Sequence, residues 1–108
     1  MYTKEEYEKY VESGRFKNYN EPLALIGLLE EVGEVAGLMK KKAIYPQYFK
    51  DIDSYNNQLK LELGDVLWQS VNLIKILGYS LEEIIELNEE KLNKRFSDTN
   101  LISKGGKR

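Results

Sequence analysis

Residues 25–39 read LIGLLEEVGEVAGLM, and this stretch decides the fold. Its leucine, valine, alanine and methionine side chains recur every three or four positions, which is the period of a helix with one apolar face. Asn20 can cap the start of this helix, and the lysine run at 40–42 suits its C-terminal end. The apolar period also contains three glutamates, Glu30, Glu31 and Glu34. The stretch therefore predicts a long helix on which acidic groups adjoin an apolar stripe.

Three further helices are expected, one before this stretch and two after it, over about residues 3–14, 54–78 and 80–96. A capping box opens the first of them at Thr3 and the last at Ser80. No segment shows the sustained alternation of polar and apolar residues that marks a strand. We therefore predict an all-α fold, an antiparallel bundle of about four helices. It forms a single domain over residues 1–97, and a flexible tail follows at 98–108.

Composition excludes several classes of function. The chain has no cysteine and no histidine, which removes thiolate nucleophiles, zinc–sulfur sites and serine–histidine triads. A net charge of −2 argues against a basic surface for nucleic acid. Neither a membrane span nor a signal peptide is apparent, so we expect a cytoplasmic protein with no membrane partner. Any chemistry must use carboxylates, lysines, arginines and an ion that they hold.

Five acidic residues have an unusual spacing, namely Glu30, Glu31, Glu34, Glu62 and Asp65. None of the five has a lysine or arginine three or four positions away, although acids elsewhere in the chain do, such as Glu5 with Lys9. Instead, the five are spaced against one another, so that like charges share a helix face. A solvated acidic face is the usual reading of helical glutamates, and the missing cationic partners weaken it here.

The helix expected over residues 54–78 is apolar around most of its circumference. The polar stripe that remains consists of Glu62, Asp65, Gln69 and Asn72. Steps of three and four residues are typical of a seam between helices. A seam lined with carboxylates requires a cation, and oxygen ligands favour magnesium, with manganese as a substitute. Because magnesium in proteins commonly meets a substrate phosphate, the pattern indicates phosphate chemistry.

The sequence resembles a known family at these positions. Residues 30–34 (EEVGE) and 62–65 (ELGD) match the EExxE…ExxD signature of the MazG-like nucleotide pyrophosphohydrolases, and an N-x-x-K-x-x-x-R helix follows at 88–95. That all-α superfamily also contains dimeric dUTPases and dCTP pyrophosphatases. The resemblance extends over roughly residues 20–97.

The resemblance implies hydrolysis of a nucleoside triphosphate between its α- and β-phosphates, giving the monophosphate and pyrophosphate, as in house-cleaning of the nucleotide pool. It assigns the magnesium ligands to Glu31, Glu34, Glu62 and Asp65. Glu30 would be a further ligand, or would orient and deprotonate the attacking water; with Glu31 it forms the expected catalytic pair. Family members assemble as homodimers or homotetramers, which is also expected here.

Contacts to the nucleotide are expected from two further helices. The resemblance implies that Asn88, Lys91 and Arg95 contact the triphosphate, and their spacing puts them on one helix face. Gln69 and Asn72 continue the polar stripe and are candidates for hydrogen bonds to the base or sugar. Phe16 and Tyr19 are candidates for stacking on the base.

Three other functions stay open from the sequence. A selective dUTPase- or dCTPase-like enzyme and a phosphoribosyl-ATP pyrophosphohydrolase are variants of the same chemistry. A helical oligomerisation module without catalysis is the alternative of another class. The presence of all five acids argues against this last alternative, because an inactive relative is expected to lose some of them.

Overall fold

The computed structural model describes residues 3–14 and 20–103, with the side chains of the last helix described as far as Ser97. Its elements are α1 (Lys4–Ser13), α2 (Glu21–Ile44), the short 3₁₀ helix η1 (Pro46–Tyr48), α3 (Ile52–Ile76) and α4 (Leu81–Ser103). No strand occurs in the described residues. The predicted all-α fold with four helices is confirmed.

The helix starts follow from local capping. Thr3 and Glu6 form the predicted capping box, in which each backbone N–H donates to the other residue's side chain. The Asn20 side chain accepts from the N–H of Leu23 at the start of α2, as predicted. The helix α3 begins at Ile52, slightly earlier than expected, because Oδ1 of Asp51 accepts from the N–H of Ser54. Asp51, which precedes the helix expected over 54–78, is therefore the N-cap of α3.

Local sequence also sets where α3 ends and where α4 begins and ends. Gly78 follows α3 with a φ of 89°, a left-handed conformation that glycine adopts without a steric penalty. The helix α4 starts after Ser80, whose hydroxyl accepts from the N–H of Glu83. It continues to Ser103 instead of ending near Phe96, because no glycine or proline interrupts residues 97–103. Part of the predicted tail at 98–108 is thus helical; the flexibility of its remainder stays a prediction, since 104–108 lie outside the described residues.

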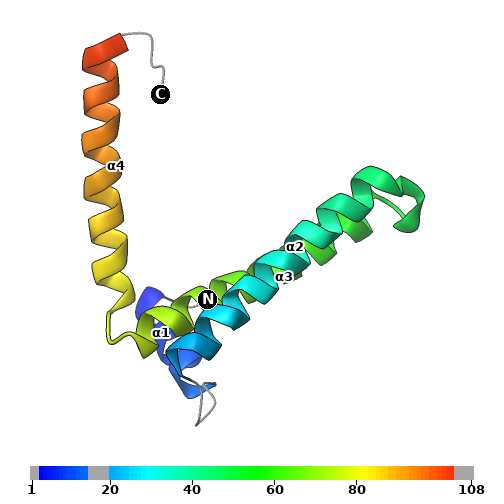
Figure 1. Ribbon diagram of the computed structural model, residues 1–108, viewed down its shortest axis with the longest axis horizontal. Helices are drawn as coiled ribbons and strands as arrows, with labels where there is room; N and C mark the ends of the chain where they lie inside the picture. Colours follow the sequence, from blue (N-terminus) through cyan, green and yellow to red (C-terminus); the bar gives the residue numbers. More distant parts are fainter. Residues whose placement is uncertain (1–2, 15–19, 104–108) are drawn as a thin grey trace.

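The helices α2 and α3 form a long antiparallel pair that is closed by η1 (Figure 1). At the closed end Phe49 is buried and lies edge-on to the rings of Tyr48 and Tyr55. The ammonium of Lys42 lies 5.5 Å from the centre of the Tyr55 ring, which brings the end of α2 beside the start of α3. This packed end fixes the register of the pair.

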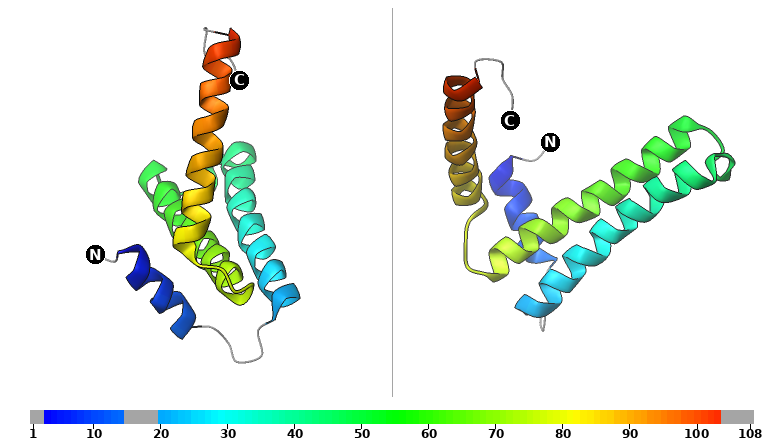
Figure 2. Two further views of the ribbon diagram at one scale, coloured as in Figure 1. Left: turned by 90° about the vertical axis from the view of Figure 1, so that its left-hand side faces the viewer. Right: turned by 45° about the horizontal axis from the view of Figure 1, so that its top comes forward.

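The helix α1 lies across the other end of the pair, and α4 leaves that end in a direction of its own (Figures 1 and 2). The most buried side chains gather where α1, α2 and α3 meet, and they are Val11, Ala24, Val71 and Asn72. Trp68 of α3 lies against Gly14 at the end of α1, so its ring packs between α3 and the end of α1. The core therefore sits at the open end of the α2–α3 pair.

A single carboxylate joins α1, α3 and α4. Oε2 of Glu8 accepts from Nζ of Lys75 at 2.8 Å and from the backbone N–H of Leu81, the first residue of α4, at 2.9 Å. These two hydrogen bonds, the lysine bond first, lower the pKa of Glu8 below its ordinary value. Glu8 therefore fixes the point from which α4 departs.

Replacing Glu8 by glutamine is expected to lower the free energy of unfolding by about 1–2 kcal/mol at pH 7, because charge-assisted hydrogen bonds at a half-buried site are lost. Since the pKa of Glu8 is lower in the folded chain than in the unfolded one, this stabilisation is present above the ordinary carboxyl pKa and is lost as pH falls through the folded pKa. Urea titrations at pH 7 and at pH 3, at one protein concentration, test this. Equal losses at both pH values would contradict the assigned role.

A single chain leaves much apolar surface uncovered. Its radius of gyration is 17.8 Å, whereas a compact domain of this length has about 13 Å. Large apolar side chains are more than half exposed on three helices, for example Leu29 of α2, Leu61 of α3 and Leu87 of α4. Within residues 3–14 and 20–103, no helix combines the length and apolar character needed to cross a membrane. Exposed apolar area of this extent is typical of a surface that another protein covers.

Candidate metal centre

Three carboxylates converge where the middle of α2 passes α3. They belong to Glu31 of α2 and to Glu62 and Asp65 of α3, and each offers an oxygen within 4.8 Å of the other two. Glu62 and Asp65 share a face because they are one turn apart, and the antiparallel pairing brings Glu31 against that face. Glu31 and Glu62 are half-buried, whereas Asp65 is exposed. Two carboxylates of the cluster are therefore partly shielded from solvent, and the third faces solvent.

The electrostatics of the cluster are unfavourable without a cation. Loss of hydration raises the pKa of Glu31, and the charges of Asp65 and Glu62 raise it further. Loss of hydration also raises the pKa of Glu62, with smaller effects from Glu34 and then Asp65. A raised carboxyl pKa means that the folded protein holds a neutralising proton more tightly than the unfolded chain. A bound cation neutralises the same charges.

The donor set fits a hard divalent cation. Every donor is a carboxylate oxygen, the ligand type that magnesium and manganese prefer. Neighbouring oxygens around magnesium lie about 3 Å apart and opposite ones about 4 Å apart. Oxygens already within 4.8 Å of one another can reach this spacing by small rotations of the side chains.

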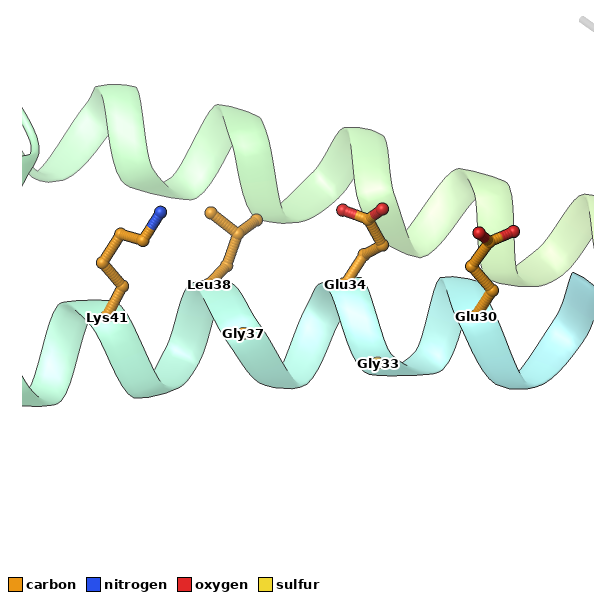
Figure 3. A pocket seen from close by; sticks show the side chains of 6 residues that line it. All are labelled: Glu30, Gly33, Glu34, Gly37, Leu38 and Lys41. Atoms are coloured by element: carbon orange, nitrogen blue, oxygen red, sulfur yellow. The ribbon is translucent and has the colours of Figure 1, made fainter.

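The other two acids of the signature flank the cluster on α2. The charges of Glu34 and Glu30 both contribute to the raised pKa of Glu31. Neither belongs to the group of three converging oxygens, but Figure 3 shows both carboxylates on the side of α2 that faces α3. Of the four expected metal ligands, the structure thus brings three into direct proximity and leaves Glu34 beside them.

The polar stripe on α3 divides into two parts. Gln69 follows Asp65 by one turn and is half-buried. Asn72 is fully buried in the core, and its amide oxygen and nitrogen have no hydrogen-bond partner among the described residues. A contact between Asn72 and a base or sugar stays a prediction, and it would require the residues that bury Asn72 to move. The periodicity of α3 predicts that Asn72 faces a seam between helices. In the structure Asn72 is fully buried, so this part of the seam is packed and offers no surface to a ligand.

The three expected phosphate contacts lie on α4. Asn88, Lys91 and Arg95 are all exposed. The views in Figures 1 and 2 agree that α4 runs away from the α2–α3 pair, on which the acidic cluster lies. Within one chain, these residues are therefore not brought to the carboxylates.

One residue near the cluster was not expected from the sequence. Loss of hydration raises the pKa of Tyr7 in α1, and the neighbouring Tyr10 and then Asp65 raise it further. The charge of Asp65 therefore influences the pKa of a residue in α1, which borders the cluster. The spacing of Tyr7 and Val11 marks the inner face of α1, but only the tertiary contact shows what that face meets. Phe16 and Tyr19, the expected stacking residues, lie outside the described residues.

Comparison with known proteins decides the family. The family profile described as MazG nucleotide pyrophosphohydrolase domain matches residues 21–99. The chain belongs to this family. The MazG match starts with α2 and ends within α4, so it includes all five acids and leaves α1 outside.

Two relatives come from Bacillus subtilis (strain 168). The uncharacterised protein YpjD is 35% identical over 95 residues, which cover 86% of this chain and 82% of that protein. The uncharacterised protein YvdC is 34% identical over 80 residues, which cover 69% of this chain and 76% of that protein. No solved structure gives a significant match to the chain.

Proposed function

We propose that this MazG-family protein is a magnesium-dependent pyrophosphohydrolase that converts nucleoside triphosphates, including deoxynucleotides, to monophosphates and pyrophosphate. One observation carries the proposal: three carboxylate oxygens from two paired helices lie within 4.8 Å of one another, with raised pKa values at Glu31 and Glu62. Such a site favours a hard cation, and membership of the MazG nucleotide pyrophosphohydrolase family indicates a nucleotide as the substrate. A role in clearing unwanted nucleotides from the pool is part of the proposal.

In the proposed mechanism, Glu31, Glu62 and Asp65 hold the ion, and Glu34 completes or orients this set. When bound, magnesium supplies positive charge that offsets the charge of the phosphates. The oxygen of water forms a bond to the α-phosphorus, and the bond from that phosphorus to the oxygen bridging to the β-phosphorus breaks. Pyrophosphate leaves with the bridging oxygen. A carboxylate, for which Glu30 is the exposed candidate, accepts the proton from water and passes it to solvent.

We further propose that the active unit is a homodimer or homotetramer. The exposed apolar side chains and the large radius of gyration support this assembly. In it, Asn88, Lys91 and Arg95 of one copy reach the carboxylate cluster of another. The direction of α4, which runs away from the α2–α3 pair of its own chain, supports this arrangement (Figure 1).

Pyrophosphate release from a panel of ordinary and damaged dNTPs, with and without magnesium, tests the proposed activity. We expect turnover only with magnesium. The inclusion of dUTP, dCTP and phosphoribosyl-ATP separates a broad enzyme from a selective one. A complete lack of turnover, together with unchanged melting on addition of magnesium and a non-hydrolysable dNTP, would instead support an inactive helical module.

A further inference from the structure

A groove runs along α2 toward the closed end of the helical pair, and it begins at Glu30 and Glu34, which flank the acidic centre formed by Glu31, Glu62 and Asp65. Its volume is about 360 Å³, and its lining residues all belong to α2: Glu30, Gly33, Glu34, Gly37, Leu38 and Lys41. Figure 3 shows the side chains of Glu30, Glu34, Leu38 and Lys41 projecting from one side of the helix toward α3. The groove therefore has carboxylates at one end and an ammonium group at the other.

The charges along the groove match an extended anion bound to a cation. Glu34 and Lys41 are seven positions apart, which corresponds to about 10 Å along a helix. A diphosphate with a metal ion at one end and a lysine hydrogen bond at the other can span this length. The carboxylates alone would repel it, so the cation of the acidic centre and the ammonium of Lys41 must both take part.

The floor of the groove leaves room for phosphate groups. A Cβ atom added at Gly33 or Gly37 would meet no other atom within 4 Å. At the far end, Lys41 is half-buried and its ammonium lies 4.3 Å from the centre of the Tyr48 ring. This cation–π contact restrains the lysine near the groove without using its hydrogen-bond donors.

The position of α1 gives the groove a direction. At Trp68, one turn beyond Asp65 toward the open end of the helical pair, α3 packs against Gly14 at the end of α1, and the charge of Asp65 contributes to the raised pKa of Tyr7 in α1. The groove leaves the centre by way of Glu34, toward the closed end. A nucleotide with its α-phosphate at the centre would therefore have its nucleoside on the α1 side and its outer phosphates in the groove.

We propose that this groove binds the β- and γ-phosphates, which leave together as pyrophosphate, and that Lys41 contacts the terminal phosphate. This inference rests on the proposed function. The positive charge of the lysines at 40–42 suits the C-terminal end of α2. In this proposal Lys41 is also part of the phosphate-binding site. Lys40, the next residue back, is exposed and does not line the groove.

The test compares Lys41→Ala with the matched control Lys40→Ala, in the full chain with magnesium. Inhibition constants are measured for pyrophosphate and for a nucleoside monophosphate, and calorimetry measures pyrophosphate binding directly. Lys41→Ala is expected to weaken pyrophosphate binding about tenfold, the loss typical of one charge-assisted hydrogen bond. It should raise KM for triphosphates, leave monophosphate inhibition unchanged, and be largely rescued by Lys41→Arg. Lys40→Ala should change none of these.

The inference is overturned if pyrophosphate binds Lys41→Ala as well as wild type, or if Lys40→Ala weakens it equally. It is also overturned if monophosphate binding weakens to the same degree, because Lys41 would then act on the whole site. Failure of the proposed function appears elsewhere, as absent turnover by the wild-type chain. In that event, calorimetry with magnesium and pyrophosphate alone still decides whether Lys41 holds a diphosphate.

Discussion

Asp65→Asn is expected to reduce kcat/KM for nucleoside triphosphates by at least about a hundredfold. Loss of a group that only orients a metal ligand commonly costs ten- to a hundredfold in affinity or activity, and we propose that Asp65 is a ligand itself. Asparagine keeps the shape of the side chain but removes its charge. Steady-state kinetics with saturating magnesium measure the effect. Asp53→Asn, at the exposed start of the same helix, is the matched control and should retain full activity.

The same substitution is expected to make the metal-free protein no less stable than wild type. The charge of Asp65 contributes to the raised pKa values of Glu31 and Glu62, so its removal relieves repulsion. It should also abolish the rise in melting temperature that magnesium produces in the wild type. If Asp65→Asn kept its activity or its response to magnesium, the metal site would be placed wrongly.

The pH dependence of stability that Glu31 and Glu62 produce has the opposite sign to the one that Glu8 produces. The raised pKa values of Glu31 and Glu62 mean that the folded, metal-free chain binds protons more tightly than the unfolded chain. These two groups therefore destabilise the metal-free fold above their folded pKa, and this cost disappears as pH falls toward the ordinary glutamate range. Magnesium competes with those protons. Its stabilisation should be largest at neutral pH and should vanish on acidification, which melting curves with and without magnesium can follow.

Mixing two inactive variants is expected to restore activity. If Lys91 serves the cluster of another copy, a hybrid of Lys91→Ala and Asp65→Asn chains contains one site free of both substitutions. In a symmetric dimer with random exchange, about one quarter of all sites are intact, so about one quarter of wild-type activity should return. Co-expression of differently tagged chains supplies the hybrids, and dNTP turnover is the measurement.

The control for this experiment is a mixture of Glu62→Gln and Asp65→Asn. Both substitutions fall in one cluster, but on different chains each hybrid site still carries one of them, so no activity should return. An inactive mixture of Lys91→Ala with Asp65→Asn, in which hybrids are shown to form, would contradict an active site shared between copies.

The features that sequence could predict are those set by local chemistry. The capping box at Thr3 and the cap at Asn20 depend on residues three positions away, and both are present. The i, i+3 spacing of Glu62 and Asp65 predicts that they share a face whatever α3 packs against. The antiparallel pairing expected for a short connection then brings Glu31 to them.

The features that could not be predicted depend on tertiary contacts. The bond between Glu8 and Lys75 joins residues 67 positions apart, and it helps to set where α1 and α4 lie. Asn72 belongs to the polar stripe, yet α3 turns it into the core, because periodicity does not distinguish a seam that faces a ligand from one that faces a helix. Lys41 reads as a helix-end charge until the groove beside it is seen (Figure 3).

The most direct test of the proposed chemistry is phosphorus NMR of the products formed from one dNTP by the wild-type protein. We expect the monophosphate and pyrophosphate in equal amounts, formed only when magnesium is present. Formation of the diphosphate and orthophosphate, or the same products at the same rate without a divalent cation, would contradict a magnesium-dependent attack at the α-phosphorus.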